Sequence, residues 1–172
     1  MDTDPGALHL AVCRRFGDAI LSADGKWGRP TPCDAWDVRG VLEHVIGFHD
    51  VLLLRPLGLK PERPRDDPQR RWELTYDALK EALGREWVID VPLPHLTRDV
   101  LVHTWDLARA VGADDRLDPR WCAMFFEGLS EDISGSGMFA APIAIDDDAD
   151  IQSKLLARLG RDPSWIARHQ AG

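Results

Sequence analysis

One helical stretch of the sequence places a carboxylate and an imidazole where they can share a ligand. Asp99 and His103 are four residues apart, so in a helix their side chains lie about 40° apart on one face. Leu96, Val100 and Leu107 follow the same stripe, which predicts that this face is turned toward the protein interior. An intrahelical pair is the simplest interpretation, because such pairs are common. A metal ion would need a third ligand from elsewhere in the chain.

A second helical stretch offers that ligand. His44 lies between Val41 and Phe48 at helical spacing, at the edge of an apolar stripe. His49 is about 140° around the helix from His44, so we expect it to face solvent or the segment that follows. Two imidazoles and one carboxylate leave an open coordination position, as in catalytic zinc sites, and also suit nickel or ferrous iron.

The spacing leaves two alternatives open. His95, Asp99 and His103 recur every four residues, so His95 competes as a ligand or as a supporting residue. Asp106 follows His103 by three residues and could hold the second nitrogen of its imidazole. A surface ion pair between Asp106 and Arg109 explains that spacing equally well.

Three more residues are candidates for the surroundings of the site. Trp36 and Trp105 adjoin the candidate metal helices, and we expect both to wall a pocket, because an exchangeable coordination position needs access. Cys33 lies in the loop before the second helical stretch and can approach the site from there. A small buried residue that fixes the loop is the simpler interpretation of Cys33. The sequence identifies neither a general acid nor an arginine that anchors a substrate.

Helical periodicity runs through nearly the whole chain and predicts an all-α fold. Asp37 is expected to cap the second helix, and Gly112 to end the fourth. We predict a four-helix bundle over residues 1–133 and a short helical extension over residues 134–172 that packs on it. The four long helices are expected over residues 7–22, 38–54, 69–87 and 95–111, with a proline-rich crossover at 56–68.

Size and charge narrow the classes of function. A chain of 172 residues is long enough for one well-buried domain, so a metal is not needed merely to fold. The net charge of −8 argues against a nucleic-acid partner. No apolar run approaches the roughly 20 residues that cross a bilayer, and the first residues do not resemble a signal peptide. We therefore expect a cytoplasmic protein with no membrane partner and with reduced thiols.

Several phrases of the sequence resemble one protein family. PTPCDAW (30–36) followed by VRGVLEHV (38–45) resembles the mycothiol-dependent maleylpyruvate isomerase-like branch of the DinB metal-binding bundles. TRDVLVHTWDLARAVG (97–112) is similar to the fourth helix of that branch, and LLARLGRDPSW (155–165) to the tail of a small actinobacterial subgroup. The resemblance implies a DinB-like four-helix bundle with a metal, usually zinc, held by His44, Asp99 and His103. It leaves His95 a supporting role.

The resemblance also implies a class of chemistry. In such proteins the metal activates a low-molecular-weight thiol, mycothiol or bacillithiol, for transferase or isomerase reactions on a small molecule. The isomerase itself carries a full second domain after the bundle, whereas here only residues 134–172 follow, so we expect a substrate other than maleylpyruvate. The alternative is a metal-containing bundle that binds a small ligand or a protein partner without turnover. The sequence leaves a homodimer open.

Overall fold

The protein is built from helices joined by loops. The computed structural model describes residues 4–86, 91–129 and 139–167. Within these ranges no strand forms, and the extended pairing is limited to an isolated antiparallel bridge between Pro30 and Asp37. The prediction of an all-α fold is confirmed for this part of the chain. None of the helices in the same ranges is long and apolar enough to pass through a lipid bilayer.

Aspartate caps set where three of the four long helices begin. The carboxylates of Asp4, Asp37 and Asp67 each accept a hydrogen bond from the backbone N–H three residues later, at 3.0, 2.7 and 2.9 Å. Such a cap satisfies a donor that has no partner within the helix. The fourth helix ends at Gly112, whose φ of +74° is a left-handed conformation that glycine adopts without strain. The four helices are α1 (Pro5–Ile20), α2 (Val38–His49), α3 (Pro68–Leu83) and α4 (Leu93–Val111).

Helix α2 runs directly into a turn of π-helix, η1 (Asp50–Leu54). The chain is thus helical as far as Leu54, as expected, although the last turn is wider than an α-helix. The crossover that follows contains no helix between residues 59 and 65. Arg63 ties it down through two bonds of 2.9 and 2.7 Å to the carboxylate of Asp50.

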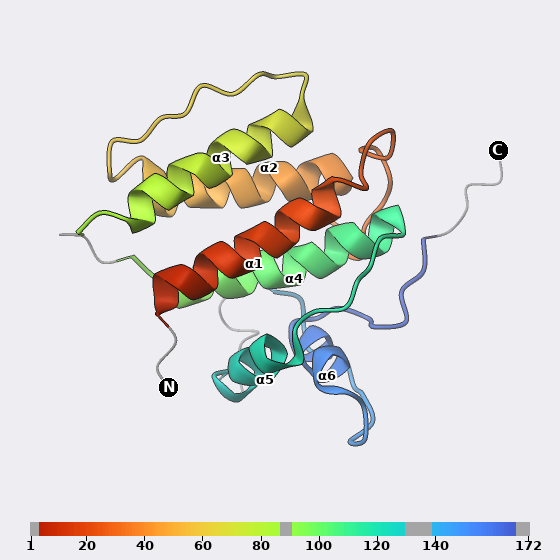
Figure 1. Ribbon diagram of the computed structural model, residues 1–172. Helices are drawn as coiled ribbons and strands as arrows, with labels where there is room; N and C mark the ends of the chain where they lie inside the picture. The colour runs from red at the N-terminus through yellow and green to blue at the C-terminus, as the bar shows by residue number, and fades with distance from the viewer. Residues whose placement is uncertain (1–3, 87–90, 130–138, 168–172) are drawn as a thin grey trace.

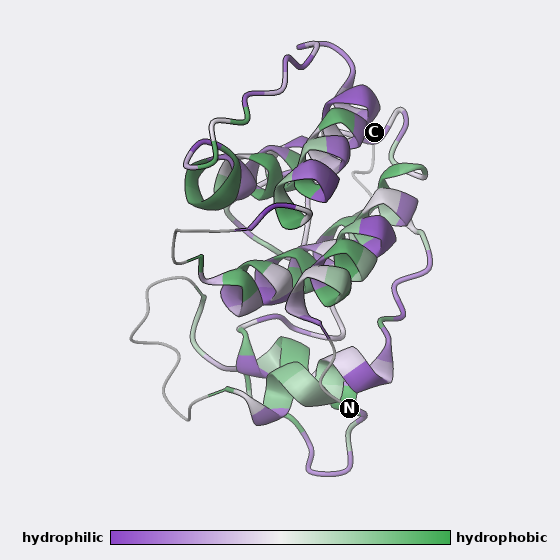
Figure 2. Ribbon diagram, turned by 60° about the vertical axis from the view of Figure 1, so that its left-hand side comes forward, coloured by the Kyte–Doolittle hydropathy of each residue, from purple (hydrophilic) through white to green (hydrophobic). Residues whose placement is uncertain are grey.

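The four long helices contact one another in a closed ring. Helix α1 packs against α3 and α4, and α2 packs against the same two helices (Figure 1). Apolar residues lie mainly on the sides of the helices that face their neighbours, and hydrophilic residues mainly on the outer sides (Figure 2). The burial of these apolar faces is what stabilises the fold. Large side chains that are fully buried include Phe16, Leu42, Leu53, Leu79, Leu101 and Leu107.

Helix α4 is enclosed on all sides along its middle. Every residue from Asp99 to Ala108 is buried, because α1 and α2 both pack on this helix and residues after α6 also bond to it. The polar side chains of this stretch therefore have to find partners within the protein.

Two shorter helices lie beside the long ones. Helices α5 (Pro119–Glu127) and α6 (Ile151–Arg158) pack against each other (Figure 1), and the side chains of Cys122 and Leu155 are buried there. The expected limit between bundle and extension, between residues 133 and 134, lies outside the described residues. The third helix was expected to run to Trp87 but ends earlier, at Leu83, because Gly84 caps it.

Two glycines of α2 allow a matched test of how closely the preceding loop packs. A Cβ added to Gly40 would lie 2.7 Å from the Cβ of Trp36, whereas a Cβ on Gly47 meets nothing within 4 Å. We expect Gly47→Ala to stabilise the protein by about 0.5–1 kcal/mol, since alanine favours a helix interior. Gly40→Ala should instead destabilise it, because Trp36 has to move. Urea unfolding measures both changes, and equal stabilisation by the two variants would contradict this packing.

Candidate metal centre

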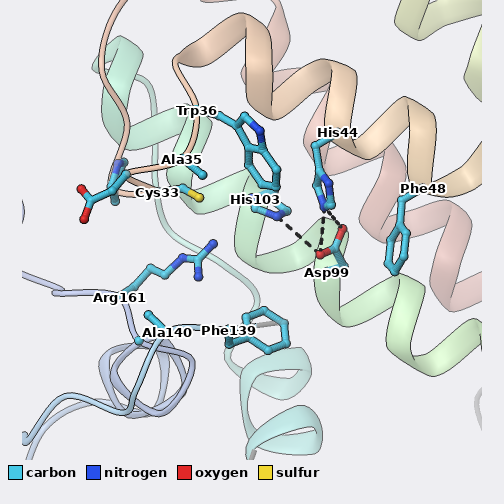
Figure 3. Close-up of a pocket in the computed structure, with 13 residues that line it drawn as sticks. Cys33, Ala35, Trp36, His44, Phe48, Asp99, His103, Phe139, Ala140 and Arg161 are labelled. Carbon is cyan, nitrogen blue, oxygen red and sulfur yellow. Dashed lines mark hydrogen bonds and ion pairs between the residues drawn. The ribbon is translucent and has the colours of Figure 1, made fainter. Parts of the chain in front are cut away.

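His44, Asp99 and His103 meet between α2 and α4. The Nε2 atom of His44 lies 3.1 and 3.3 Å from the two carboxylate oxygens of Asp99, and Nε2 of His103 lies 3.4 Å from one of them. All three candidate ligand atoms lie within 4.8 Å of one another, and the side chains point toward a common centre (Figure 3). The structure thus brings together the residues that spacing and resemblance selected, in a grouping that could hold a metal ion.

A buried hydrogen bond orients the imidazole of His103. Its Nδ1 lies 2.8 Å from Oδ2 of Asp106. Because an ionised carboxylate only accepts hydrogen bonds, Nδ1 carries the proton and Nε2 is left facing Asp99. A carboxylate that holds the outer nitrogen of a histidine is the usual support of a metal-bound imidazole. The expected contact between Asp106 and the second nitrogen of His103 is therefore present in the structure.

The carboxylates around His103 favour a positive charge, which is a proton on Nε2 in the metal-free protein and which a bound metal ion would replace. Burial alone would lower the pKa of His103, but the carboxylates of Asp106 and Asp99 outweigh it and raise that pKa to about 9. Burial would raise the pKa of Asp99, yet hydrogen bonds from His103 and His44 hold it below its usual range. Asp99 is therefore ionised at neutral pH, as a metal ligand must be. The donor set of two imidazoles and a carboxylate fits zinc or ferrous iron.

The carboxylate of Asp106 also binds a residue that is distant in the sequence. Nε and Nη2 of Arg161 lie 3.2 and 2.9 Å from its two oxygens, and both side chains are buried. Gly160, with a φ of +78°, turns the chain just after α6 so that Arg161 can reach α4. The alternative of a surface ion pair between Asp106 and Arg109 is wrong, because Arg109 binds Asp115 at 2.6 Å instead.

Aromatic rings hold His44 on both sides. The ring of Trp36 is stacked on it with centroids 4.3 Å apart, and the ring of Phe48 is also near parallel at 5.5 Å. In Figure 3 the imidazole lies between the two. This packing restricts the ring of His44 and directs its Nε2 toward Asp99.

A pocket of about 600 Å³ opens beside the three residues. Its far wall comes from the C-terminal part of the chain, where Arg161 and Phe139 face the cluster (Figure 3). A pocket of this volume is large enough to hold a small metabolite beside the candidate metal ligands. The lining consists of Pro32, Cys33, Asp34, Ala35, Trp36, His44, Phe48, Asp99, His103, Phe139, Ala140, Gly160 and Arg161.

Of the other residues that were expected at the site, some line the pocket and some lie elsewhere. Trp36 and Cys33 line the pocket, and burial raises the pKa of the Cys33 thiol, which keeps it neutral. Trp105 does not line it: this tryptophan is buried in the core, because residues two apart in a helix point about 200° apart and His103 takes the pocket side. His95 is exposed, beside Arg98, and is not part of the cluster.

Two features were missed or misplaced by the sequence analysis. Arg161 had no local signal, since nothing in its own neighbourhood shows that it reaches Asp106. His49 was expected to face solvent or the crossover, but its side chain has no exposed surface. It lies instead against His9 of α1, because the ring of helices covers more of α2 than one apolar stripe indicates.

Two proteins from strains of Mycobacterium tuberculosis are similar to this chain. They are named Uncharacterized protein Rv0738 and Uncharacterized protein MT0763, and each is 29% identical over 136 residues, which span 67% of this chain and 72% of the relative. No protein-family model matches the chain, and no solved structure does. Because neither relative's name states a function, the function has to be inferred from the site itself.

The buried pair of Asp106 and Arg161 can be tested against an exposed one. Asp106→Asn should lower the free energy of unfolding by about 3–5 kcal/mol, because it leaves a buried guanidinium without its counter-charge. It should also weaken metal binding about 10- to 100-fold through His103. Asp115→Asn, which breaks the partly exposed pair with Arg109, should cost about 1 kcal/mol or less. Chemical denaturation and metal titration measure these effects, and a loss below about 1 kcal/mol in Asp106→Asn would contradict the role of this carboxylate.

Proposed function

We propose that this protein is a metal-dependent thiol transferase or isomerase that acts on a small electrophilic metabolite. The observation that carries the proposal is the cluster of His44, Asp99 and His103 at the wall of an open pocket. We further infer that the four long helices form a bundle of the DinB type, as the sequence resemblance implies. Zinc is the favoured metal, with nickel or iron as alternatives, and mycothiol is the favoured thiol.

The chain's own residues prepare the site for this chemistry. A divalent ion held by His44, Asp99 and His103 would, when bound, stabilise the deprotonated form of a thiol or water near neutral pH. Asp106 holds a proton on Nδ1 of His103, so that a metal ion would displace only the second proton, the one on Nε2, and coordinate there. Trp36 packs on His44 and covers it from the loop side.

Arg161 supplies a positive charge to the pocket. Asp106 and the carbonyl oxygen of Leu159 occupy three of its N–H donors, and a guanidinium has about five. The remaining donors can bind a carboxylate of the thiol or of the substrate. This matters in a chain of net charge −8, because an anionic ligand needs a local cation.

A ligand-binding protein without turnover is the second candidate, and one observation favours it. Among the described residues that line the pocket, the titratable groups outside the metal cluster and Arg161 are Cys33 and Asp34. Burial raises the pKa of the Cys33 thiol above its usual range, so that it gives up its proton poorly near neutral pH, and Asp34 is exposed. Neither is a well-placed general acid.

Removal of one ligand tests the metal site. His44→Ala should lower the metal content by one equivalent per chain and leave the helical content intact, because this side chain is partly exposed and the core does not depend on it. Asp99→Ala and His103→Ala should lower the metal content in the same way and keep the helices, but with a loss of stability, because both side chains are buried. His95→Ala is the matched control, since His95 is on α4 but exposed. Metal analysis with circular dichroism gives the result, and full metal content in all three ligand variants would reject the site.

Turnover separates the two candidate functions. The metal-loaded protein is mixed with mycothiol and a panel of small electrophiles, and loss of free thiol is followed together with product mass. We expect metal-dependent conjugation or isomerisation that His44→Ala abolishes and His95→Ala retains. Saturable binding of mycothiol without any product would instead support the binding protein.

A further inference from the structure

Three side chains that the pocket does not use meet in the interior of the protein. His9 and Cys13 lie one turn apart on α1, and His49 ends α2; none of the three has exposed surface. The two Nε2 atoms are 2.9 Å apart, and Sγ of Cys13 lies 3.5 Å from that of His9 and 3.9 Å from that of His49. None of the three lines the pocket beside His44.

Hydrogen bonds on the outer side of each ring fix where the imidazole protons are. Nδ1 of His49 lies 2.7 Å from the carbonyl oxygen of Val45, which only accepts, so this nitrogen carries a proton. Nδ1 of His9 lies 2.8 Å from the hydroxyl oxygen of Thr97. That hydroxyl donates its own hydrogen to the carbonyl oxygen of Leu93 at 2.8 Å, so it accepts from His9.

Both neutral rings therefore turn an unprotonated Nε2 toward the other. Two lone pairs at this distance repel unless a cation lies between them. An imidazolium does not fill that role, because the ring nitrogens of these fully buried side chains meet a hydroxyl, a carbonyl and a thiol, and an ionised ring there would lack a counter-charge. The thiol hydrogen of Cys13 can satisfy only one of the two nitrogens. The cluster is left with a lone pair that has no donor, in a place without water access.

We propose that His9, Cys13 and His49 form a second metal site, for a soft thiophilic ion such as Zn²⁺ or Cu⁺. Two imidazole nitrogens and one thiolate are the ligand types that such ions prefer. A tetrahedral zinc holds nitrogen ligands about 3.3 Å apart and nitrogen and sulfur about 3.6 Å apart. The observed separations are within about 0.4 Å of those values. Binding releases the thiol proton of Cys13 to solvent and leaves both imidazoles neutral.

The site links two helices through three protein ligands. It is closed to solvent, and it joins α1 to the end of α2, while Thr97 of α4 supports His9 from behind. The hydrogen bonds from Nδ1 to Thr97 and Val45 are the kind that orient metal-bound histidines. The cluster at His44 differs in its ligands and in its access to solvent. It carries a carboxylate in place of a thiolate, and it opens to a pocket.

Cobalt distinguishes the two sites by their ligands. The full chain is refolded without oxygen in the presence of Co²⁺. A thiolate bound to Co²⁺ gives a strong near-ultraviolet charge-transfer band, which imidazole and carboxylate ligands do not. We expect the wild type to bind two equivalents and to show this band. Cys13→Ala should lose the band and one equivalent, and His44→Ala should lose the other equivalent and keep the band.

The other two cysteines are controls. Cys122 is as fully buried as Cys13 but lies on α5, so Cys122→Ala should keep the band. Cys33 lines the pocket, and a band that disappears in Cys33→Ala and persists in Cys13→Ala would overturn the proposal, as would a wild type without the band. Should Cys13→Ala fail to fold, Cys13→Ser removes the thiolate with little change in volume. Metal analysis of protein produced with added zinc or added copper then identifies the ion.

Discussion

The carboxylate of Asp106 has no exposed surface, and much of the site depends on how its charge is compensated. It accepts a hydrogen bond from His103 and two from Arg161, and burial is costly for an ionised group without such partners. The first contact keeps a proton on Nδ1 of His103 and turns Nε2 toward Asp99. The second anchors the segment after α6 against α4, and this segment forms part of the far wall of the pocket. One buried charge thus orients a candidate ligand and holds the cavity in shape.

The same constraint explains why two histidine clusters of different chemistry lie so near each other. Helix α4 is buried along its middle, so the polar groups that it carries or meets can be satisfied only by one another. Where the surroundings include carboxylates, the pKa of the imidazole rises, as in His103. The ring nitrogens of His9 and His49 instead meet a hydroxyl, a carbonyl and a thiol, and burial outweighs the pull of Asp99 and Asp50 on His49, so both imidazoles stay neutral. The first environment suits a divalent ion open to a ligand, and the second a soft ion sealed from water.

The helix ends and the pairs of residues within one helix could be predicted from residues that are close in sequence. The aspartate cap at Asp37 and the end of α4 at Gly112 were predicted and are confirmed, because capping depends on a few consecutive residues. The pairing of Asp99 with His103, and of His103 with Asp106, follows from helical spacing in the same way. The assignment of Trp105 to the pocket was wrong, since nearness in sequence to a ligand does not place a side chain on the ligand's face.

By itself, the sequence determined the helices, their limits to within a few residues, and the residues that share a face within each helix. These are local properties, set by the periodicity of the α-helix and by the chemistry of its ends. Only the tertiary structure decided which faces meet. It turned His49 inward against His9, brought Arg161 to Asp106, and stacked Trp36 on His44. Contacts between helices depend on the rotation of each helix about its own axis and on how many neighbours cover it, and no short stretch of sequence carries that information.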